Sequence, residues 1–422
     1  MPKVLPAELE EARKKSGPIA RREKYLAYSM LSPTAFSVLL IILVPLLANF
    51  WVSVKPVELA DLRAAKVLVR ERVKGDLPAS VAQRLSVEYR VRSSSPNKAI
   101  DNVTLADEVP PGLEIVEIDP PCAEQGGRIL CDFGTLEPRE QVKVRIAFEA
   151  QAAFFHNDPV SPAQSNPIVD GKAKNSLISL EFTLDNFRKV FDASEFWDVL
   201  WVTVVYTIFG TVGALLLGLL ASQLMMVTFP GRSILRGLFL FPYVSPVIAV
   251  AFTWIFLLDP FSGTMNALLQ KTGVTTEAIN FLGTRGLALW TVIAFEAWRY
   301  FPLAFLFILA RMQSLSSDLN EAAEMDGATP MQKFWHISLP QLIGIISTLF
   351  LLRFIWTFNK FDDIFLLTGG ASGTRTLTVN VYEQAFALSN LGAGAAVAVV
   401  IFFVLVVFIT FYFKFIPKEE GM

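Results

Sequence analysis

The chain has 422 residues, of which 53% are hydrophobic, 12% aromatic and only 18% charged. This composition is too apolar for a set of ordinary soluble domains and indicates an integral membrane protein. A net charge of −2, with no basic tract interleaved with aromatic residues, argues against a nucleic-acid partner. The sequence contains no G-x-x-x-x-G-K-[ST] motif, so ATP would have to be handled by another polypeptide.

A basic tail, residues 1–24, precedes the first apolar stretch. It carries Lys3, Arg13, Lys14, Lys15, Arg21, Arg22 and Lys24. Because basic residues flanking a span are retained in the cytoplasm, we expect this tail inside. The apolar stretch that follows, 25–54, is far longer than the core of a signal peptide, so we interpret it as an anchor that is not cleaved.

Six stretches are long and apolar enough to cross about 30 Å of hydrocarbon, which takes roughly 20 helical residues. They are Tyr25–Val54, Val199–Thr228, Gly237–Leu258, Gly286–Ala310, Pro340–Phe358 and Gln384–Phe413. With six spans, the tails and short loops place thirteen Lys and Arg on the side of the N-terminal tail and four on the other. Both termini, including the tail 414–422, are therefore predicted to be cytoplasmic in a multi-pass protein.

Between the first two spans lies a hydrophilic insertion, 55–198, which is long enough for a separate domain and is expected to face outward. Its centre, about 84–150, alternates apolar and polar residues like half-buried strands, at Leu85–Val91, Val103–Leu105, Leu113–Ile118 and Val142–Phe148. This pattern predicts a small antiparallel β-sandwich. The flank 57–84 could be a charged helix, and we expect the flank 151–184 to be an extended linker.

Cys122 and Cys131 are the only cysteines, and both fall in this outward, oxidising region. The natural interpretation is a disulfide that closes a short hairpin. A metal site is not predicted, because the two histidines, His156 and His336, are expected on opposite sides of the membrane.

Two stripes of polar residues lie within the fourth and fifth spans. Each has the i, i+3, i+4, i+7 spacing of one helix face: Glu296, Arg299, Tyr300 and Leu303, then Arg353, Trp356, Thr357 and Lys360. A cation at mid-bilayer costs roughly 2.5–3.5 kcal/mol on insertion scales, so such residues usually face a bundle interior or a water-filled cavity. We expect the two faces to converge on one cavity. The alternatives are an intrahelical Glu296–Arg299 ion pair, and snorkelling of Arg353 and Lys360 toward the outer interface.

The loop 311–339 between these spans has a distinctive sequence, EAAEMDGATPMQKFWHISLP from Glu321 to Pro340. Ser316, Ser317 and Asp318 supply N-cap oxygens for a short helix from about Leu319, and Asp326-Gly327 ends it. Thr329-Pro330 then starts a second helix that leads into the next span. The predicted helix–turn–helix suits insertion into a groove on a partner protein.

The spacing of EAA, Gly327 and Ile337-x-Leu339-Pro340 resembles the docking motif of permease subunits in bacterial binding-protein-dependent ABC importers. Together with Trp298-x-x-x-Pro302 and the run from Phe361 to Gly370, the resemblance covers about residues 190–415 and is to the sugar permeases of maltose type, which carry a large outer insertion. It implies the ABC importer permease fold in the bacterial inner or plasma membrane, with ATPase coupling through Glu321, Ala322, Ala323, Asp326, Gly327, Ile337, Leu339 and Pro340.

The same resemblance implies a function and a set of partners. The eight stripe positions are expected to line a sugar pocket, although several residue types differ from the family's. The partners would be a second permease in a heterodimer, two ATPase subunits that bind ATP and Mg, and a soluble solute-binding protein. The chain itself would bind no cofactor and catalyse no reaction. The segment 84–150 separately resembles immunoglobulin-like repeats of bacterial surface proteins.

Other functions remain open from the residues alone. Arg299, Arg353 and Lys360 leave an anionic sugar or a glycerophosphate possible as the substrate. A membrane-anchored surface-interaction protein would rely on the sandwich, but an anchor needs neither an EAA helix nor polar stripes. An ion-driven secondary transporter would predict inverted repeats, and the sequence shows no convincing repeat.

Overall fold

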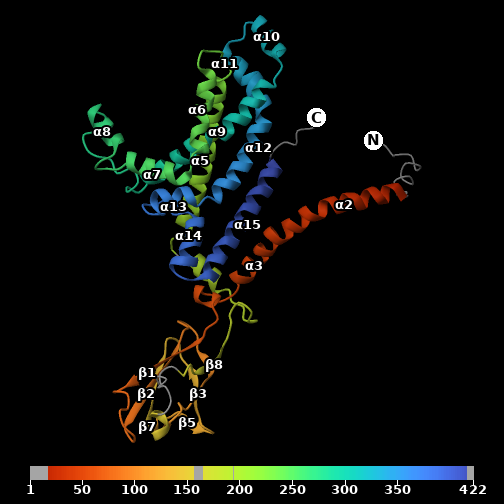
Figure 1. Cartoon of the computed structure of the whole chain (residues 1–422). Coiled ribbons are helices and arrows are strands. Elements are labelled where there is room, and N and C mark those ends of the chain that lie inside the picture. The colour runs from red at the N-terminus through yellow and green to blue at the C-terminus, as the bar shows by residue number, and fades with distance from the viewer. Residues whose placement is uncertain (1–17, 156–164, 193, 416–422) are drawn as a thin grey trace. The chain divides into compact units, whose positions relative to one another are not determined.

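The computed structural model describes residues 18–155, 165–192 and 194–415. They form two compact units. The helical unit comprises the described residues up to Val54, Phe187–Tyr382 and those from Ala393 onward, whereas the strand unit comprises Lys55–Asn186 and Glu383–Gly392. Figure 1 traces the elements of both along the chain. The basic residues Lys3, Arg13, Lys14 and Lys15 of the tail lie outside the described residues.

The longest helical elements follow the apolar stretches of the sequence, and shorter helices lie between them. They are α2 (Pro18–Val38), η1 (Leu39–Leu43), α3 (Val44–Ser53), α4 (Asp185–Asp192), α5 (Phe196–Leu224), α6 (Arg232–Val244), α7 (Val247–Leu257), α8 (Thr264–Lys271), α9 (Leu287–Gln313), α10 (Ser317–Met325), α11 (Pro330–Lys333), η4 (Phe334–Ser338), α12 (Leu339–Phe358), α13 (Asp362–Thr368), α14 (Leu377–Tyr382), η5 (Glu383–Ala387) and α15 (Leu391–Phe415). Among the described residues, five helices are long and apolar enough to span a membrane, or up to six if one bent pair counts as a span.

The predicted third span, 237–258, is not one straight helix. The chain bends by 95° between α6 and α7, where Ser245 adopts an extended conformation before Pro246. Proline lacks a backbone N–H and disfavours helical geometry in the residue before it, so the helix stops at this point. The predicted span therefore corresponds to a bent pair of helices, and the break was not predicted because apolar residues were counted without regard to Ser245-Pro246.

The fifth span begins earlier than predicted. α11, η4 and α12 form one helix of 29 residues, Pro330–Phe358, so Pro340 is not its start. The wider π-helical turn η4 lies immediately before Leu339 and Pro340, and such turns accommodate a residue that cannot donate the usual backbone hydrogen bond.

Glycines on α5 allow it to lie very close to α9. A Cβ added at Gly218 would be 2.6 Å from the Cβ of Ala304 and 2.8 Å from the backbone nitrogen of Phe305, and one at Gly213 would be 2.9 Å from the Cβ of Ala297. Small residues at a helix crossing permit this approach in membranes, where packing drives helix association.

The strand unit consists of two four-stranded antiparallel sheets. Their orders are β1-β2-β7-β4 and β5-β6-β3-β8. The strands are β1 (Val67–Lys74), β2 (Arg84–Ser93), β3 (Ile100–Glu108), β4 (Leu113–Ile118), β5 (Cys122–Gln125), β6 (Arg128–Leu136), β7 (Gln141–Ala150) and β8 (Ile168–Ala173). The four predicted strand segments lie within β2, β3, β4 and β7.

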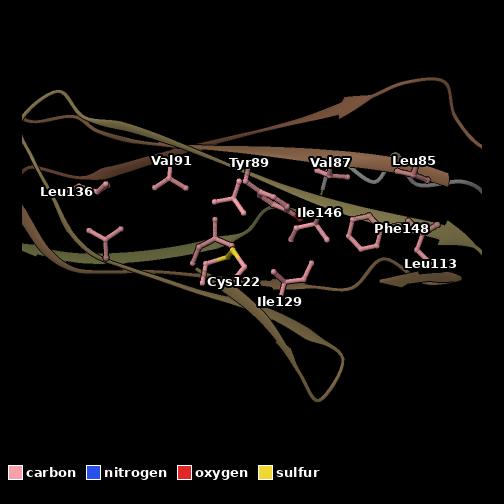
Figure 2. Packing of buried hydrophobic residues seen from close by; sticks show 14 of the residues in the cluster. Leu85, Val87, Tyr89, Val91, Leu113, Cys122, Ile129, Leu136, Ile146 and Phe148 are labelled. Carbon is pink, nitrogen blue, oxygen red and sulfur yellow. A yellow bond between two sulfur atoms is a disulfide. The ribbon is translucent and has the colours of Figure 1, made fainter. Parts of the chain in front are cut away.

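Both sheets contribute to a single core. Figure 2 shows Val87, Tyr89 and Ile146 of the first sheet lying opposite Cys122 and Ile129 of the second. These side chains are buried because every second residue of a strand points to the same face.

Both flanks of the insertion differ from expectation. The first contains a single turn, η2 (Leu59–Leu62), and then β1 instead of a charged helix. The second contains η3 (Ala152–Phe155) and β8, so the described part of it is not simply an extended linker. The unit also ends at Asn186 rather than at Asp198, because Phe187 and Val190 of α4 pack in a core cluster of the helical unit.

Candidate functional site

A buried carboxylate in the middle of α9 is the centre of the polar residues in the membrane helices. Glu296 has no exposed surface, and it forms an ion pair with the guanidinium of Arg353 on α12. Thr357 Oγ1 donates to one carboxylate oxygen at 2.9 Å, and Tyr206 Oη of α5 donates to the other at 3.1 Å. The structure therefore brings the two predicted stripes together at Glu296.

Three cations of the same cluster lie near the ring of Tyr300, and Arg299 is the farthest, with its guanidinium carbon 5.5 Å from the ring centroid. The guanidinium carbon of Arg353 lies 4.2 Å from the ring centroid, and Lys360 Nζ lies 4.3 Å from it. The Lys360 ammonium also donates to the Tyr300 hydroxyl. A ring face attracts cations more strongly where water is excluded.

Arg299 supports the bend between α6 and α7. Its two terminal nitrogens donate to the carbonyl oxygens of Pro242 at 3.2 Å and of Ser245 at 3.1 Å. A helix that ends inside a membrane leaves carbonyl groups without partners, and these donors satisfy two of them. Arg299 therefore has a structural task in this conformation.

The structure distinguishes between the alternative arrangements of the two polar stripes. Glu296 pairs with Arg353 on another helix, so the intrahelical Glu296–Arg299 ion pair is wrong. Arg353 is 2% exposed and does not snorkel; Lys360 points to Tyr300 and lies 3.6 Å from a carboxylate oxygen of Asp362.

Two residues of the cluster were not predicted from the sequence. Asp363 of α13 is fully buried, and its oxygens lie 3.9 Å from Arg299 Nε and 3.8 Å from Lys360 Nζ. Tyr206 is the other. The signal for Tyr206 was its position on the polar face of α5 with Thr203 and Thr207; Asp363 gave none except its place in a pair of acids beside Lys360.

Two predicted residues are not joined to the cluster. Trp356 is 48% exposed and Leu303 is half-buried. Neither has a hydrogen bond or ring contact with the buried charges.

The charges of the cluster nearly balance. Arg299, Arg353 and Lys360 face the buried carboxylates of Glu296 and Asp363, and Asp362 adds a half-exposed third carboxylate. Each cation has at least one carboxylate within 4 Å, so the protein itself supplies the counter-charges that burial requires.

The second candidate site is the loop around α10. Ser316 caps α10 by accepting from the backbone nitrogen of Asp318 at 3.2 Å. Gly327, at φ +76°, follows the C-terminus of α10. Thr329 and Gln332 form a reciprocal capping box at the start of α11, with Pro330 as its first residue. The sharp turn between two helices is thus built from local signals.

This loop presents both charge and apolar surface. The structure leaves Glu321, Ala322, Asp326, Gly327 and Pro340 exposed, and Ala323, Ile337 and Leu339 half-buried. Apolar side chains are exposed beside them, at Met325, Met331 and Trp335. Exposed apolar side chains grouped with charged ones mark surfaces that contact other proteins.

Cys122 and Cys131 are joined by a disulfide between paired positions of β5 and β6. Both belong to the core of the strand unit. No group of three or more His, Cys, Asp or Glu side chains in the described part of the chain could hold a metal ion. His156 lies outside the described residues.

Comparisons with known proteins connect these features. Residues 214–418 match the family described as "Binding-protein-dependent transport system inner membrane component". The chain is 34% identical over 223 residues to the inner membrane ABC transporter permease protein YcjO of Escherichia coli K12, covering 53% of this chain and 75% of that protein. It is 32% identical over 232 residues to the trehalose/maltose transport system permease protein MalF of Thermococcus litoralis, covering 55% and 78%.

Two further similarities are relevant. The sn-glycerol-3-phosphate transport system permease protein UgpA of Escherichia coli UTI89 is 31% identical over 242 residues, with 56% of this chain and 80% of that protein covered. The structure of a bacterial ABC transporter involved in import of the acidic polysaccharide alginate has a TM-score of 0.51 at 21% identity, over 56% of this chain and 84% of that one. This last likeness is one of fold.

Proposed function

Because the chain belongs to the family of inner membrane components of binding-protein-dependent transport systems, as a permease of the sugar ABC importers, we propose that it imports a neutral saccharide delivered by an extracytoplasmic binding protein. The cluster around Glu296 is the observation that carries this proposal. It offers hydroxyl, carboxylate and guanidinium groups, and sugars are bound by such groups combined with aromatic faces.

The charge balance of the cluster favours a neutral substrate. Arg353 is engaged by Glu296, Arg299 by two carbonyls and Asp363, and Lys360 by Tyr300 and two aspartates. To bind an anionic substrate, Arg299, Arg353 or Lys360 would first have to separate from the carboxylate that it contacts in the protein. In this proposal Glu296, Thr357 and Tyr300 exchange hydrogen bonds with sugar hydroxyls, and Trp356 stacks on a ring face. Arg299, Leu303, Arg353 and Lys360 shape and neutralise the pocket.

ATP hydrolysis would be coupled to transport through the loop around α10. Glu321, Ala322 and Met325 are exposed on the short helix α10, and the exposed Asp326 and Gly327 follow its C-terminus; together they suit a groove on an ATPase subunit. Ala323 on the same helix and the segment Ile337–Pro340 later in the loop would also take part in coupling. The chain itself needs no nucleotide, and ATP and Mg belong to the partner subunits.

The remaining assembly follows from the same proposal. A second permease completes a heterodimer, and two ATPase subunits bind on the cytoplasmic side, where both termini lie. The strand unit is an immunoglobulin-like domain on the outer side, consistent with its disulfide, because such bonds persist in oxidising compartments. The broken pair α6 and α7 counts as the third of six spans.

Uptake from a substrate panel tests the choice of a neutral sugar. Proteoliposomes would contain the permease with its partner subunits and binding protein, and would be offered labelled maltose, trehalose, sn-glycerol-3-phosphate and an alginate oligosaccharide. We expect uptake of a neutral sugar, an at least tenfold loss with Trp356→Ala, and little change with Trp201→Ala, a control at an exposed tryptophan of α5 outside the cluster and the loop. Uptake of the phosphate or the uronate alone would contradict the neutral-saccharide proposal while leaving the permease assignment intact.

A further inference from the structure

The outer face of one sheet in the strand unit is strongly basic. Residues that point away from the core on β1, β2 and β7 include seven cations: Arg70, Arg72, Lys74, Arg90, Arg92, Lys143 and Arg145. We name these seven the basic face. Glu88 is the one carboxylate that lies among the seven, because Glu149, which also points outward on β7, pairs with Arg84 of β2 at 3.7 Å. The seven cations therefore give this surface an excess of six positive charges.

This concentration is not a consequence of composition. Residues 55–186 contain 16 Lys and Arg but 20 Asp and Glu, so the segment as a whole is acidic. The acids of this sheet are gathered elsewhere, at Glu114 and Glu117 of β4, Asp119 after it, and Glu149 at the end of β7. The basic face therefore lies beside a group of acidic residues on the same sheet.

The register places like charges directly opposite each other. Arg90 pairs with Arg70 on one side and with Lys143 on the other, which makes a row of three cations across three strands. Directly opposed like charges destabilise an antiparallel sheet. A destabilising arrangement of this kind, with no evident compensating gain in stability, is expected mainly at functional sites.

The cations have few partners within the protein. Glu88 accepts a hydrogen bond from Arg90 Nε at 2.6 Å and lies 3.9 Å from Lys74 Nζ. The hydrogen bond from Arg90 lowers the pKa of Glu88. The other five cations of the basic face form no ion pair with a described residue, and Arg70, Arg90 and Arg92 line a depression of about 250 Å³ with Leu68 and Gln141.

The chemistry of this surface selects among partners. Protein interfaces bury aromatic residues and deplete lysine at their centre, and single-stranded nucleic acids need aromatic stacking. The outward positions of these strands carry no aromatic side chain, and Leu68 and Ala147 are their only apolar ones. A membrane-surface site would pair the charges with inserting apolar groups. Five of the seven cations are arginines, whose planar forks match carboxylate and sulfate groups.

We propose that the basic face binds an acidic polysaccharide outside the cytoplasmic membrane, a chain whose repeated carboxylate or sulfate groups pair with successive cross-strand rows. This inference rests on the proposed outward location of the strand unit but is independent of the transported substrate. Several weak ion pairs to one chain add through their linkage, which a single small anion cannot achieve.

Binding of the full-length protein to polygalacturonate tests the proposal. The protein is held in nanodiscs of neutral phosphatidylcholine, and immobilised polygalacturonate is compared with neutral dextran. We expect binding to polygalacturonate alone, weakened about tenfold or more between about 0.1 M and 1 M salt, because the screening length falls from about 10 Å to 3 Å.

The triple variant Arg70→Gln/Arg90→Gln/Lys143→Gln removes the central row and should raise the Kd at least about tenfold. The matched control Arg128→Gln/Arg139→Gln/Lys172→Gln removes the same charge from exposed positions off the basic face and should leave the Kd within about twofold. The thermal midpoint of the row variant should stay equal or rise, because opposed like charges are relieved.

Three results would overturn the proposal: equal binding of dextran, unchanged binding by the row variant, or binding of phosphatidylglycerol vesicles without binding of polygalacturonate. Sugar uptake by the row variant should match the wild type, so a failure of this proposal leaves the transport assignment standing.

Discussion

Glu296 shows how a single buried charge is stabilised by its neighbours in this membrane protein. Its carboxylate receives donors from Arg353, Thr357 and Tyr206, and a Cβ added at Gly210 would lie 2.9 Å from its Cγ. A charge at this depth persists only with its partner, because removing one member leaves the other buried and uncompensated. The pair is therefore expected to matter for folding as well as for transport.

Substitution of the pair separates these two roles. Glu296→Gln or Arg353→Gln alone should lower stability by about 3–5 kcal/mol, and the double variant should recover part of that loss. The measurement is thermal unfolding in detergent. As a control, Glu195→Gln breaks the exposed Glu195–Arg375 ion pair and should cost less than about 1 kcal/mol. Single variants as stable as the wild type would show that the pair is absent from the folded protein.

At the scale of elements, the contact between α5 and α9 positions the cluster, because Tyr206 and Glu296 come from these two helices. Gly218 and Gly213 remove side chains where the backbones meet. Any added atom must push the helices apart, and the separation would be transmitted to the hydrogen bond between Tyr206 and Glu296.

Gly218→Ala tests this contact. We expect destabilisation of roughly 1–3 kcal/mol from overpacking, with reduced uptake. Gly237→Ala on α6 is the matched control, since a Cβ there has no neighbour within 4 Å; it should be neutral or stabilise by up to about 1 kcal/mol. The comparison is made by thermal unfolding of both variants, and equal effects would contradict the close contact.

Local signals account for what the sequence could predict. Ser316, Gly327 and the pair Thr329-Pro330 fix the turn around α10 through contacts a few residues apart, and strict alternation revealed β2 and β7. Contacts between residues far apart in the sequence could not be predicted in this way, because the carbonyls that Arg299 caps lie more than 50 residues away. β1 was misread because four of the last five residues of Val67–Lys74 are charged, at Arg70, Glu71, Arg72 and Lys74, and a charged helix tolerates such a run.

At the scale of the whole molecule, the protein combines a helical permease unit with a separate strand unit. The family match covers residues 214–418, so the strands of the strand unit, with their basic face, lie before the matched region. The first membrane helix also has a surface that needs lipid or a partner, since its most apolar window is 0% buried within the protein. The permease assignment rests on the helical unit, and the polysaccharide proposal concerns the strand unit.

The central claim, that this chain is the permease of an ATP-driven importer coupled through the loop around α10, is tested most directly by measuring ATP hydrolysis and substrate uptake together. Proteoliposomes with all subunits would compare the wild type with Glu321→Lys and with Glu277→Lys, a control charge reversal at an exposed residue of the loop between α8 and α9. We predict ATP-dependent uptake by the wild type and the control. Glu321→Lys should hydrolyse ATP at a basal rate without uptake. Wild-type uptake by Glu321→Lys, or uptake that persists without the ATPase subunits, would contradict the account.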